Sequence, residues 1–390
     1  MAHLSALLLI IILLSQSFID LELVLPVDGW TFNAPIADWA AVLLLPIAAV
    51  GWLRGERAPL PGWAGYGLML LAAALSVQVA ISPEDSFHHL IRKPLFFYLA
   101  YGVGLVWVVR RVRAEILWGA LIAWALSTAS LSLLTSISRI GAGDALWFAD
   151  IAGLTPNHKT LAVGLSTALP LLIGRYGSAP RRILAFSIGL SLAAILLSAS
   201  KTAWIIAVFS VAFFLPRSRP IACRPHLVLP ALILALALAY YAPILLGSKT
   251  MLDAARSRHS LNERAWMMFT AHPLVGSGTG MNVLVEQVTF PHYRVNGVDA
   301  HGVIQKVGSE TGLLGLAGYG WFSLASLLAI RRRWTEDGGE YGGEYGGRRY
   351  GALGCVAALQ VSLLLSTETF SQTWWIPFAV AWGQAHREEE

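Results

Sequence analysis

The sequence predicts an all-α, polytopic membrane protein, because apolar segments recur along the whole chain and charged residues avoid them. Of the 390 residues, 56% are hydrophobic and only 13% are charged, and the mean hydropathy is +0.61. A soluble domain usually carries about 25% charged residues. Many of the apolar segments approach the roughly 20 residues that an α-helix needs to cross a bilayer. A soluble helical protein would need a polar shell that this composition does not provide.

The apolar segments predict about twelve transmembrane helices in one domain that covers residues 1–390. They lie at 4–19, 39–53, 63–81, 95–109, 115–137, 160–174, 183–198, 202–215, 226–246, 302–330, 351–367 and 372–385. Several are short for a perpendicular crossing, so we expect flanking residues to extend them. The first has no Lys or Arg before it and no clean small-residue cleavage site after it. It is therefore expected to be a retained helix rather than a signal peptide.

An even number of crossings places both termini on one side, and the charge of the loops indicates which side. Cytoplasmic loops of membrane proteins are enriched in Lys and Arg. One set of alternate loops, with the C-terminal tail, holds Arg54, Arg57, Arg110, Arg111, Arg113, Arg175, Arg181, Arg182, Arg217, Arg219, Arg224, Arg331, Arg332, Arg333, Arg348, Arg349 and Arg387. We therefore expect this set and both termini to be cytoplasmic. The long loop 247–301, between the ninth and tenth segments, should face outward.

The cations on the outer side run against this bias and need another explanation. Each alone is compatible with a solvated or interfacial charge, but as a group they indicate an anionic substrate at the outer leaflet. They are Arg92, Lys93, Arg139, Lys159, Lys201, Lys249, Arg256, Arg258, Arg264, Arg294 and Lys306.

The loop 247–301 is predicted to contain an amphipathic helix near 260–271. Ser260 and Glu263 have capping-box spacing, which would place the helix start at Ser260. Arg264 lies at the edge of an apolar stripe made by Leu261, Ala265, Met268 and Phe269. Such a helix can lie on the membrane surface. Arg264 would then point along the protein or membrane face, or would only snorkel to headgroups.

The entrance to the tenth segment carries a polar stripe. His301 and Gln305 are four residues apart, and Gly308, Ser309 and Gly312 continue the same helical ridge. This ridge can line a cavity, or it can be a helix-packing seam. The histidine favours the cavity, because imidazole can accept a proton near neutral pH.

Other polar residues lie at predicted outer helix ends. Lys201 occupies a very short connection between two apolar segments, where a charge is a functional candidate, although helix-end lysines also snorkel. Asn157, His158 and Lys159 form a cluster at the entrance of the sixth segment, and Glu368 marks another helix end.

Several other features predict no chemistry. The histidines lack metal-ligand spacing, so no metal site and no cofactor are expected. Cys223 and Cys355 fall in a cytoplasmic loop and a span, which does not favour a disulfide. Gly276, Gly278 and Gly280 predict a tight turn, and GGEYGGEYGG at 338–347 predicts a low-complexity cytoplasmic loop.

These features, in this order, resemble the bacterial O-antigen ligase and O-antigen polymerase superfamily, and the ligases most closely. The resemblance covers roughly 150–330 by motif and the whole chain by topology. Its pieces are TPNHKTLAVGLSTALPLL, SASKTAW, ERAWMMFTAHPLVGSGTGMN and AHGVIQKVGSETGLLG. Two departures are that the family usually has Arg at the position of Lys201 and Asn at the position of Gly302.

The resemblance implies a metal-independent glycosyltransferase of the GT-C type in the bacterial inner membrane, active at its periplasmic face. The donor would be a glycan on undecaprenyl diphosphate and the acceptor lipid A–core, with membrane lipids as surroundings and no nucleic-acid partner. His301 would be the base, and Arg264 and Lys201 would stabilise the leaving diphosphate. Lys159, His158, Asn157, Gln305 and Glu368 would contact substrate.

Two alternatives stay open. A polymerase of the same superfamily would use another lipid-linked repeat as acceptor. A transporter of anionic lipid-linked glycan would also need outer cations and a polar ridge, but should show inverted repeats or interrupted helices in matching halves. The sequence shows no convincing pair.

Overall fold

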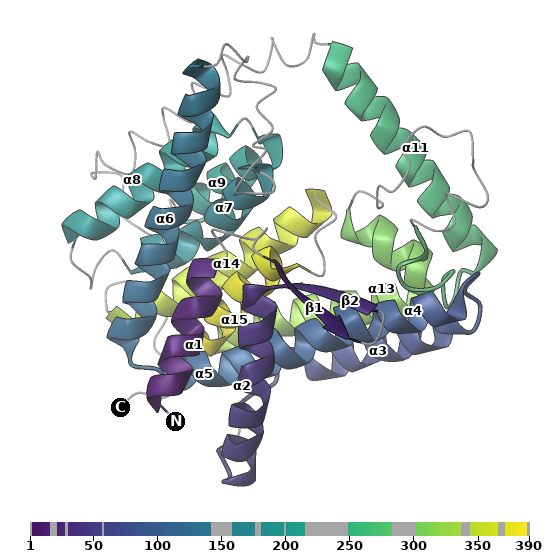
Figure 1. Ribbon diagram of the computed structural model, residues 1–390, viewed down its shortest axis with the longest axis horizontal. Coiled ribbons are helices and arrows are strands. Elements are labelled where there is room, and N and C mark those ends of the chain that lie inside the picture. The colour runs from purple at the N-terminus through teal and green to yellow at the C-terminus, as the bar shows by residue number, and fades with distance from the viewer. Residues whose placement is uncertain are drawn as a thin grey trace.

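The computed structural model describes residues 2–15, 22–27, 30–56, 58–141, 158–175, 181–198, 200–214, 249–282, 302–336, 344–365 and 371–387, and these are helical almost throughout (Figure 1). The elements are α1 (Ala2–Ser15), β1 (Glu22–Val27), β2 (Trp30–Pro35), α2 (Ile36–Leu53), α3 (Trp63–Val77), α4 (Pro83–Leu90), the π-helices η2 (Ile91–Leu95) and η3 (Tyr98–Leu105), α5 (Val106–Arg111), α6 (Ala114–Gly141), α7 (His158–Gly174), α8 (Arg181–Leu197), α9 (Lys201–Ala212), α11 (Lys249–Ala271), α13 (Val303–Glu336), α14 (Glu344–Leu365) and α15 (Gln372–Ala385).

The helices follow the predicted apolar segments. Each predicted segment within the described residues coincides with a helix, and 226–246 lies outside them. Four helices are long and apolar enough to cross a membrane: Ile36–Leu53, Pro83–Arg111, Ala114–Leu134 and Val303–Glu336. The helices α1, α3, α7, α8 and α9 are apolar but shorter. The number of transmembrane helices, about twelve, therefore stays a prediction.

A short β-hairpin between α1 and α2 departs from the all-α expectation. β1 pairs with β2 in antiparallel register, from Glu22 opposite Pro35 to Val27 opposite Trp30. The residues between the strands are Asp28 and Gly29, a dipeptide typical of two-residue hairpin turns. Each strand has only six residues, which is much shorter than a helix that crosses a membrane. The apolar segments of the sequence therefore did not predict the hairpin.

Helix α13 packs along α3 through glycines. A Cβ on Gly65 would overlap the backbone of Phe322, and a Cβ on Gly318 would lie 2.7 Å from the backbone nitrogen of Met69. Small residues of this kind let helix backbones approach closely in a membrane. This contact holds the long helix α13 in place, and α13 in turn carries the predicted polar ridge.

A second glycine contact, between α7 and α14, corrects part of the prediction for 338–347. Helix α14 begins at Glu344, so the last residues of that tract are helical rather than a loop. A Cβ on Gly347 would overlap the carbonyl oxygen of Gly174. Glycine lowers intrinsic helix propensity, which favoured a loop, but close packing between helices favours glycine at this position. Residues 337–343 lie outside the described ranges.

One end of the helices gathers arginines from connections that are far apart in the sequence. Arg111, after α5, forms an ion pair with Glu56, between α2 and α3. Nε of Arg110 donates to the carbonyl oxygen of His386 at 2.9 Å. Arg349, on α14, donates to the carbonyl oxygen of Arg333, on α13, at 3.1 Å.

Further contacts join the remaining basic connections to this end. The guanidinium of Arg387 donates to the carbonyl oxygen of Val112. Burial, together with the nearby charges of Arg175 and Arg387, lowers the pKa of Arg348 to about 10. We call this the arginine-rich end. Those predicted cytoplasmic connections that these contacts join therefore lie together, and the N and C labels are close to each other in Figure 1.

The other ends of the same helices also meet. A Cβ on Gly278 would contact Ala80, after α3, and a Cβ on Gly280 would contact the ring of His89, on α4. A Cβ on Gly302 would lie 3.2 Å from the carbonyl oxygen of Leu364, at the end of α14. We call this the polar end, because it carries the side chains described next.

Candidate functional site

Helix α13 is interrupted at Gly312, and the turn after α11 fills the break. Gly312 has φ 65° and ψ −161°, which is not helical. In a continuous α-helix the amides of Leu313 and Leu314 would donate to the carbonyls of Ser309 and Glu310. Here those amides donate to the carbonyls of Pro273 and Leu274, at 2.8 and 3.2 Å.

The carbonyls released by the break are bound by the same turn. The amides of Ser277 and Gly278 donate to Ser309 and Glu310, at 2.9 and 3.1 Å. The segment 273–278 thus replaces each backbone bond that the interruption removes. Because a buried unpaired backbone group costs free energy comparable to a lost hydrogen bond, this exchange makes the break tolerable inside the protein.

Glycine is required on both sides of this exchange. Gly276 has φ 74°, and a Cβ there would overlap the backbone of Glu310 and Thr311. A Cβ on Gly312 would overlap the backbone of Leu274 and Val275. The predicted tight turn at Gly276, Gly278 and Gly280 is confirmed, since all three have positive φ. The expected helical ridge from Gln305 to Gly312 ends at the break.

Side chains fasten the turn to three helices. Nδ2 of Asn282 donates to Oγ of Ser309 at 2.8 Å and to Oε1 of Glu310 at 3.3 Å. Oγ of Ser277 donates to the carbonyl oxygen of Met268, on α11, at 3.1 Å. Oγ1 of Thr279 donates to the carbonyl oxygen of Ser86, on α4, at 3.0 Å. The turn 272–282 therefore ties α4, α11 and α13 together at the polar end.

Arg264 lies on the buried face of α11. Leu261, Ala265 and Met268 are buried, as the predicted stripe requires, and Arg264 is only 6% exposed. Trp266 and Met267, on the opposite face, are exposed. The predicted helix start at Ser260 is wrong, because α11 begins at Lys249. The capping-box spacing lies inside a longer helix, where Ser260 does not act as an N-cap.

Two further charged residues are buried on α13 before the break. Lys306 is 7% exposed and Glu310 is 2% exposed, and they are one helical turn apart. A charged side chain that is this deeply buried in an apolar protein marks a candidate functional site. Gln305, predicted to contact substrate, is partly buried on the same helix.

A second polar group lies on α2 and on the π-helical part of Pro83–Arg111. The hydroxyl of Tyr101 donates to Oδ1 of Asp38 at 2.6 Å. Lys93 and Arg92, in η2, lie near enough to act on the Asp38 carboxylate electrostatically. Short π-helical stretches inside longer helices are often found at functional sites. This group gives the outer cations Arg92 and Lys93 a partly buried carboxylate neighbour.

Of the remaining predicted site residues, only Lys201 can be placed relative to Arg264, and the two lie on different helices. Lys201 is exposed at the first position of α9, where Oγ of Ser200 caps the helix by accepting from the amide of Ala203. Figure 1 shows α9 and α11 apart. His158 and Lys159 are the first residues of α7, and their side chains lie outside the described residues. Asn157, His301 and Glu368 also lie outside them.

Asn282 and Glu310 escaped the sequence-based prediction. A signal was available for Glu310, since an ionisable residue inside a predicted span is a functional candidate. Asn282 offered none, because its partners are distant in the sequence. Within the described residues, no three His, Cys, Asp or Glu side chains are placed to hold a metal ion.

Comparison of this chain with models of known protein families gives no match, and comparison with curated proteins gives none either.

Proposed function

We propose that the protein is a glycosyltransferase that moves a glycan from undecaprenyl diphosphate to lipid A–core. The proposal rests on the resemblance to the O-antigen ligases. One structural observation supports it most: α11, which carries the buried Arg264, packs against α13, which begins two residues after His301. In the sequence, His301 therefore comes two residues before a helix that packs against the helix of Arg264.

The chemistry requires a base and fixed positive charge. The acceptor hydroxyl oxygen forms a bond to the anomeric carbon, and the bond from that carbon to the diphosphate oxygen breaks. The diphosphate leaves with the electron pair, and His301 takes the hydroxyl proton. General-base catalysis of this kind contributes about 10²–10⁴-fold. Positioned cations stabilise the negative charge that develops on the leaving group.

Arg264 is the best supported cation for this work, because it is buried at the polar end beside a helix that also buries Lys306. Lys201 is supported differently. It lies at the N-terminal end of α9, where the helix dipole already favours anions. Because α9 and α11 are apart, we propose that Lys201 contacts a different part of the donor from Arg264.

We propose that the polar end faces the periplasm and that both termini are cytoplasmic, in the inner membrane. The gathering of arginines at the other end supports this orientation.

A labelling experiment tests the orientation. Thr270 and Thr335 are exposed at the two ends and can be replaced by Cys in a chain without Cys355 and Cys223. An impermeant thiol reagent added to intact cells should label only position 270. Labelling of only position 335 would reverse the orientation.

A transporter of lipid-linked glycan is the second candidate, and the break in α13 is the observation that favours it. Transporters often bind substrate at interrupted helices, which occur in matching halves. The break at Gly312 is one half of that pattern. The transporter would move lipid-linked glycan across a sealed membrane without joining it to an acceptor.

A reconstituted assay separates these functions. Purified protein receives lipid-linked glycan together with lipid A–core or a second glycan lipid. A ligase joins glycan to lipid A–core, a polymerase extends the second lipid, and a transporter makes neither product.

The variant His301→Gln tests the proposed base in the same assay, because Gln cannot take a proton at neutral pH. Transfer should fall by about 10²–10⁴-fold while donor binding is kept. A folded His301→Gln protein with wild-type turnover would exclude His301 as the base.

A further inference from the structure

An open groove of about 680 Å³ lies at the arginine-rich end, opposite the polar end. Its walls come from the segment 58–62, the start of α3, the C-terminal half of α13 and the end of α15. Trp382 forms part of it, and its indole nitrogen donates to the carbonyl oxygen of Pro59 at 2.9 Å. We call it the Trp–Arg groove, after Trp63, Trp321, Arg332 and Arg333, which line it.

One side of the groove is apolar and open. Trp63 is 67% exposed and Trp321 is 55% exposed. Along α13, Ala325 and Ala329 follow Trp321 at intervals of four residues, so they lie on the same face. Because these side chains are small, they leave an apolar strip of the groove along α13, about 16 Å long from Trp321 to Arg332. We call this strip the alanine lane. Exposed tryptophans on a membrane helix are typical of the headgroup region of a bilayer.

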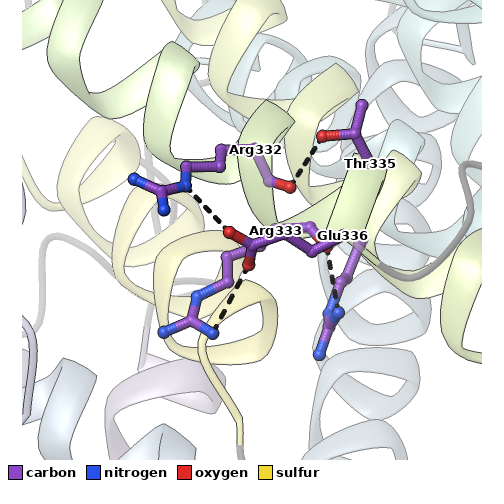
Figure 2. A network of polar contacts seen from close by, with 5 residues as sticks. Arg332, Arg333, Thr335 and Glu336 are labelled. Carbon is purple, nitrogen blue, oxygen red and sulfur yellow. Dashed lines mark hydrogen bonds and ion pairs between the residues drawn. The ribbon is translucent and has the colours of Figure 1, made fainter.

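The other side of the groove is positively charged. Nε of Arg332 donates to Oε1 of Glu336 at 2.8 Å, and a guanidinium nitrogen of Arg333 lies 3.7 Å from Oε2 of Glu336 (Figure 2). Two guanidinium groups thus share one carboxylate, which leaves a net positive charge at the mouth. Both arginines are largely exposed, so they can reach a ligand in the groove.

The floor of the groove adds no charge at neutral pH. His386 stacks on Trp382, with 4.2 Å between ring centres. Burial lowers the pKa of His386 to about 4, and the charges of Arg333, Arg110 and Arg349 act in the same direction. The imidazole is therefore neutral at pH 7, and the positive charge of the groove comes from its arginines.

We propose that the Trp–Arg groove binds one anionic phospholipid of the leaflet at the arginine-rich end. The phosphate would lie against Arg332 and Arg333, and an acyl chain would lie along Trp321 and the alanine lane. Charge complementarity carries the choice of ligand: basic pockets between membrane helices bind anionic headgroups, and the adjoining lane is apolar. The site is separate from the proposed donor site, which lies at the polar end.

Native mass spectrometry of the purified full chain in detergent tests this proposal, with phosphatidylglycerol as the anionic probe and phosphatidylcholine, whose headgroup is zwitterionic with no net charge, as the control. No glycan donor or acceptor is present, so the result does not depend on the proposed transfer activity. Phosphatidylglycerol should bind more tightly than phosphatidylcholine. The double variant Arg332→Ala/Arg333→Ala should weaken phosphatidylglycerol binding by about 25-fold, at about fivefold per arginine.

Two variants make the test specific. Arg331→Ala removes an equal charge from the neighbouring position, which does not line the groove, and should leave binding unchanged. Glu336→Gln removes the competing carboxylate and should strengthen binding severalfold, whereas a merely structural ion-pair network would only lose stability.

Three outcomes would overturn the proposal. Equal affinity for the two lipids would show an apolar groove without headgroup selection. A loss in Arg331→Ala equal to the loss per arginine in the double variant would show diffuse attraction to the whole basic surface. Displacement of the lipid by millimolar inorganic phosphate would show an anion site in which the alanine lane has no part.

Discussion

The backbone amide of Ser277 donates to the carbonyl oxygen of Ser309 at 2.9 Å, where a continuous helix would use the amide of Leu313. It is one of four backbone hydrogen bonds around Gly312 that join α13 to the turn 273–278, in place of bonds that a continuous helix would make within itself. Through the hydrogen bond of Ser277 to Met268, the turn also ties α11, which buries Arg264, to α13, which buries Lys306 and Glu310.

The glycines of this exchange should be intolerant of a side chain. Gly276→Ala and Gly312→Ala should each destabilise the protein by about 1–3 kcal/mol, because a Cβ would overlap the facing backbone. Gly320→Ala is the matched control on α13, since a Cβ there meets nothing within 4 Å. Thermal unfolding in detergent measures the difference. If Gly276→Ala unfolded at the same temperature as Gly320→Ala, the docked turn would not contribute to stability.

The contact of Asn282 with Glu310 should be sensitive to charge. Asn282→Asp places a second carboxylate next to Glu310, so it should destabilise the protein more than Asn282→Ala does. In a Glu310→Gln background this extra cost should shrink. A double-mutant cycle on unfolding free energies should give a coupling of about 1 kcal/mol, within the range for contacting groups. A coupling near zero would mean that the two side chains do not interact.

Arg264→Ala and Lys201→Ala should each reduce transfer by about 10²–10³-fold without loss of membrane insertion, because each removes a fixed charge from the leaving diphosphate. Lys201→Arg should keep substantial activity, because the ligases that the sequence resembles usually have Arg at this position. Glu263→Ala, at an exposed position next to Arg264, is the control for α11 and should transfer normally. Transfer at the wild-type rate by both Ala variants would remove these residues from the mechanism.

The stability of the protein should depend on pH through His386. The folded pKa of His386, about 4, lies below the ordinary histidine pKa of 6.5, so between these pH values the unfolded chain binds a proton that the folded protein does not. The resulting stability is present above pH 6.5 and is lost as the pH falls toward 4, by up to about 3 kcal/mol. His386→Phe keeps a ring against Trp382 but cannot titrate. Its unfolding free energy should fall less between pH 7 and pH 4, and an equal fall would assign the pH dependence to other groups.

The sequence by itself determined where helices form and which helix ends carry the arginines. Apolar segments and the spacing of arginines are local properties, and burial of apolar surface acts on each segment separately. The predicted segments therefore coincide with helices wherever the structure describes them, and Arg110, Arg333 and Arg349 meet at one end. The apolar stripe beside Arg264 was equally readable, because helical spacing alone defines a face.

Only the tertiary structure decided how the polar end is built. The break at Gly312 exists because a turn about 35 residues earlier supplies the missing backbone partners, and no local pattern encodes such a pairing. The same holds for Asn282 with Glu310, and for the groove between Trp63 and Arg332, whose walls come from separate helices. Local propensity favoured a loop at Gly347, and close packing against α7 overrode it. The capping-box spacing favoured a helix start at Ser260, but α11 begins at Lys249.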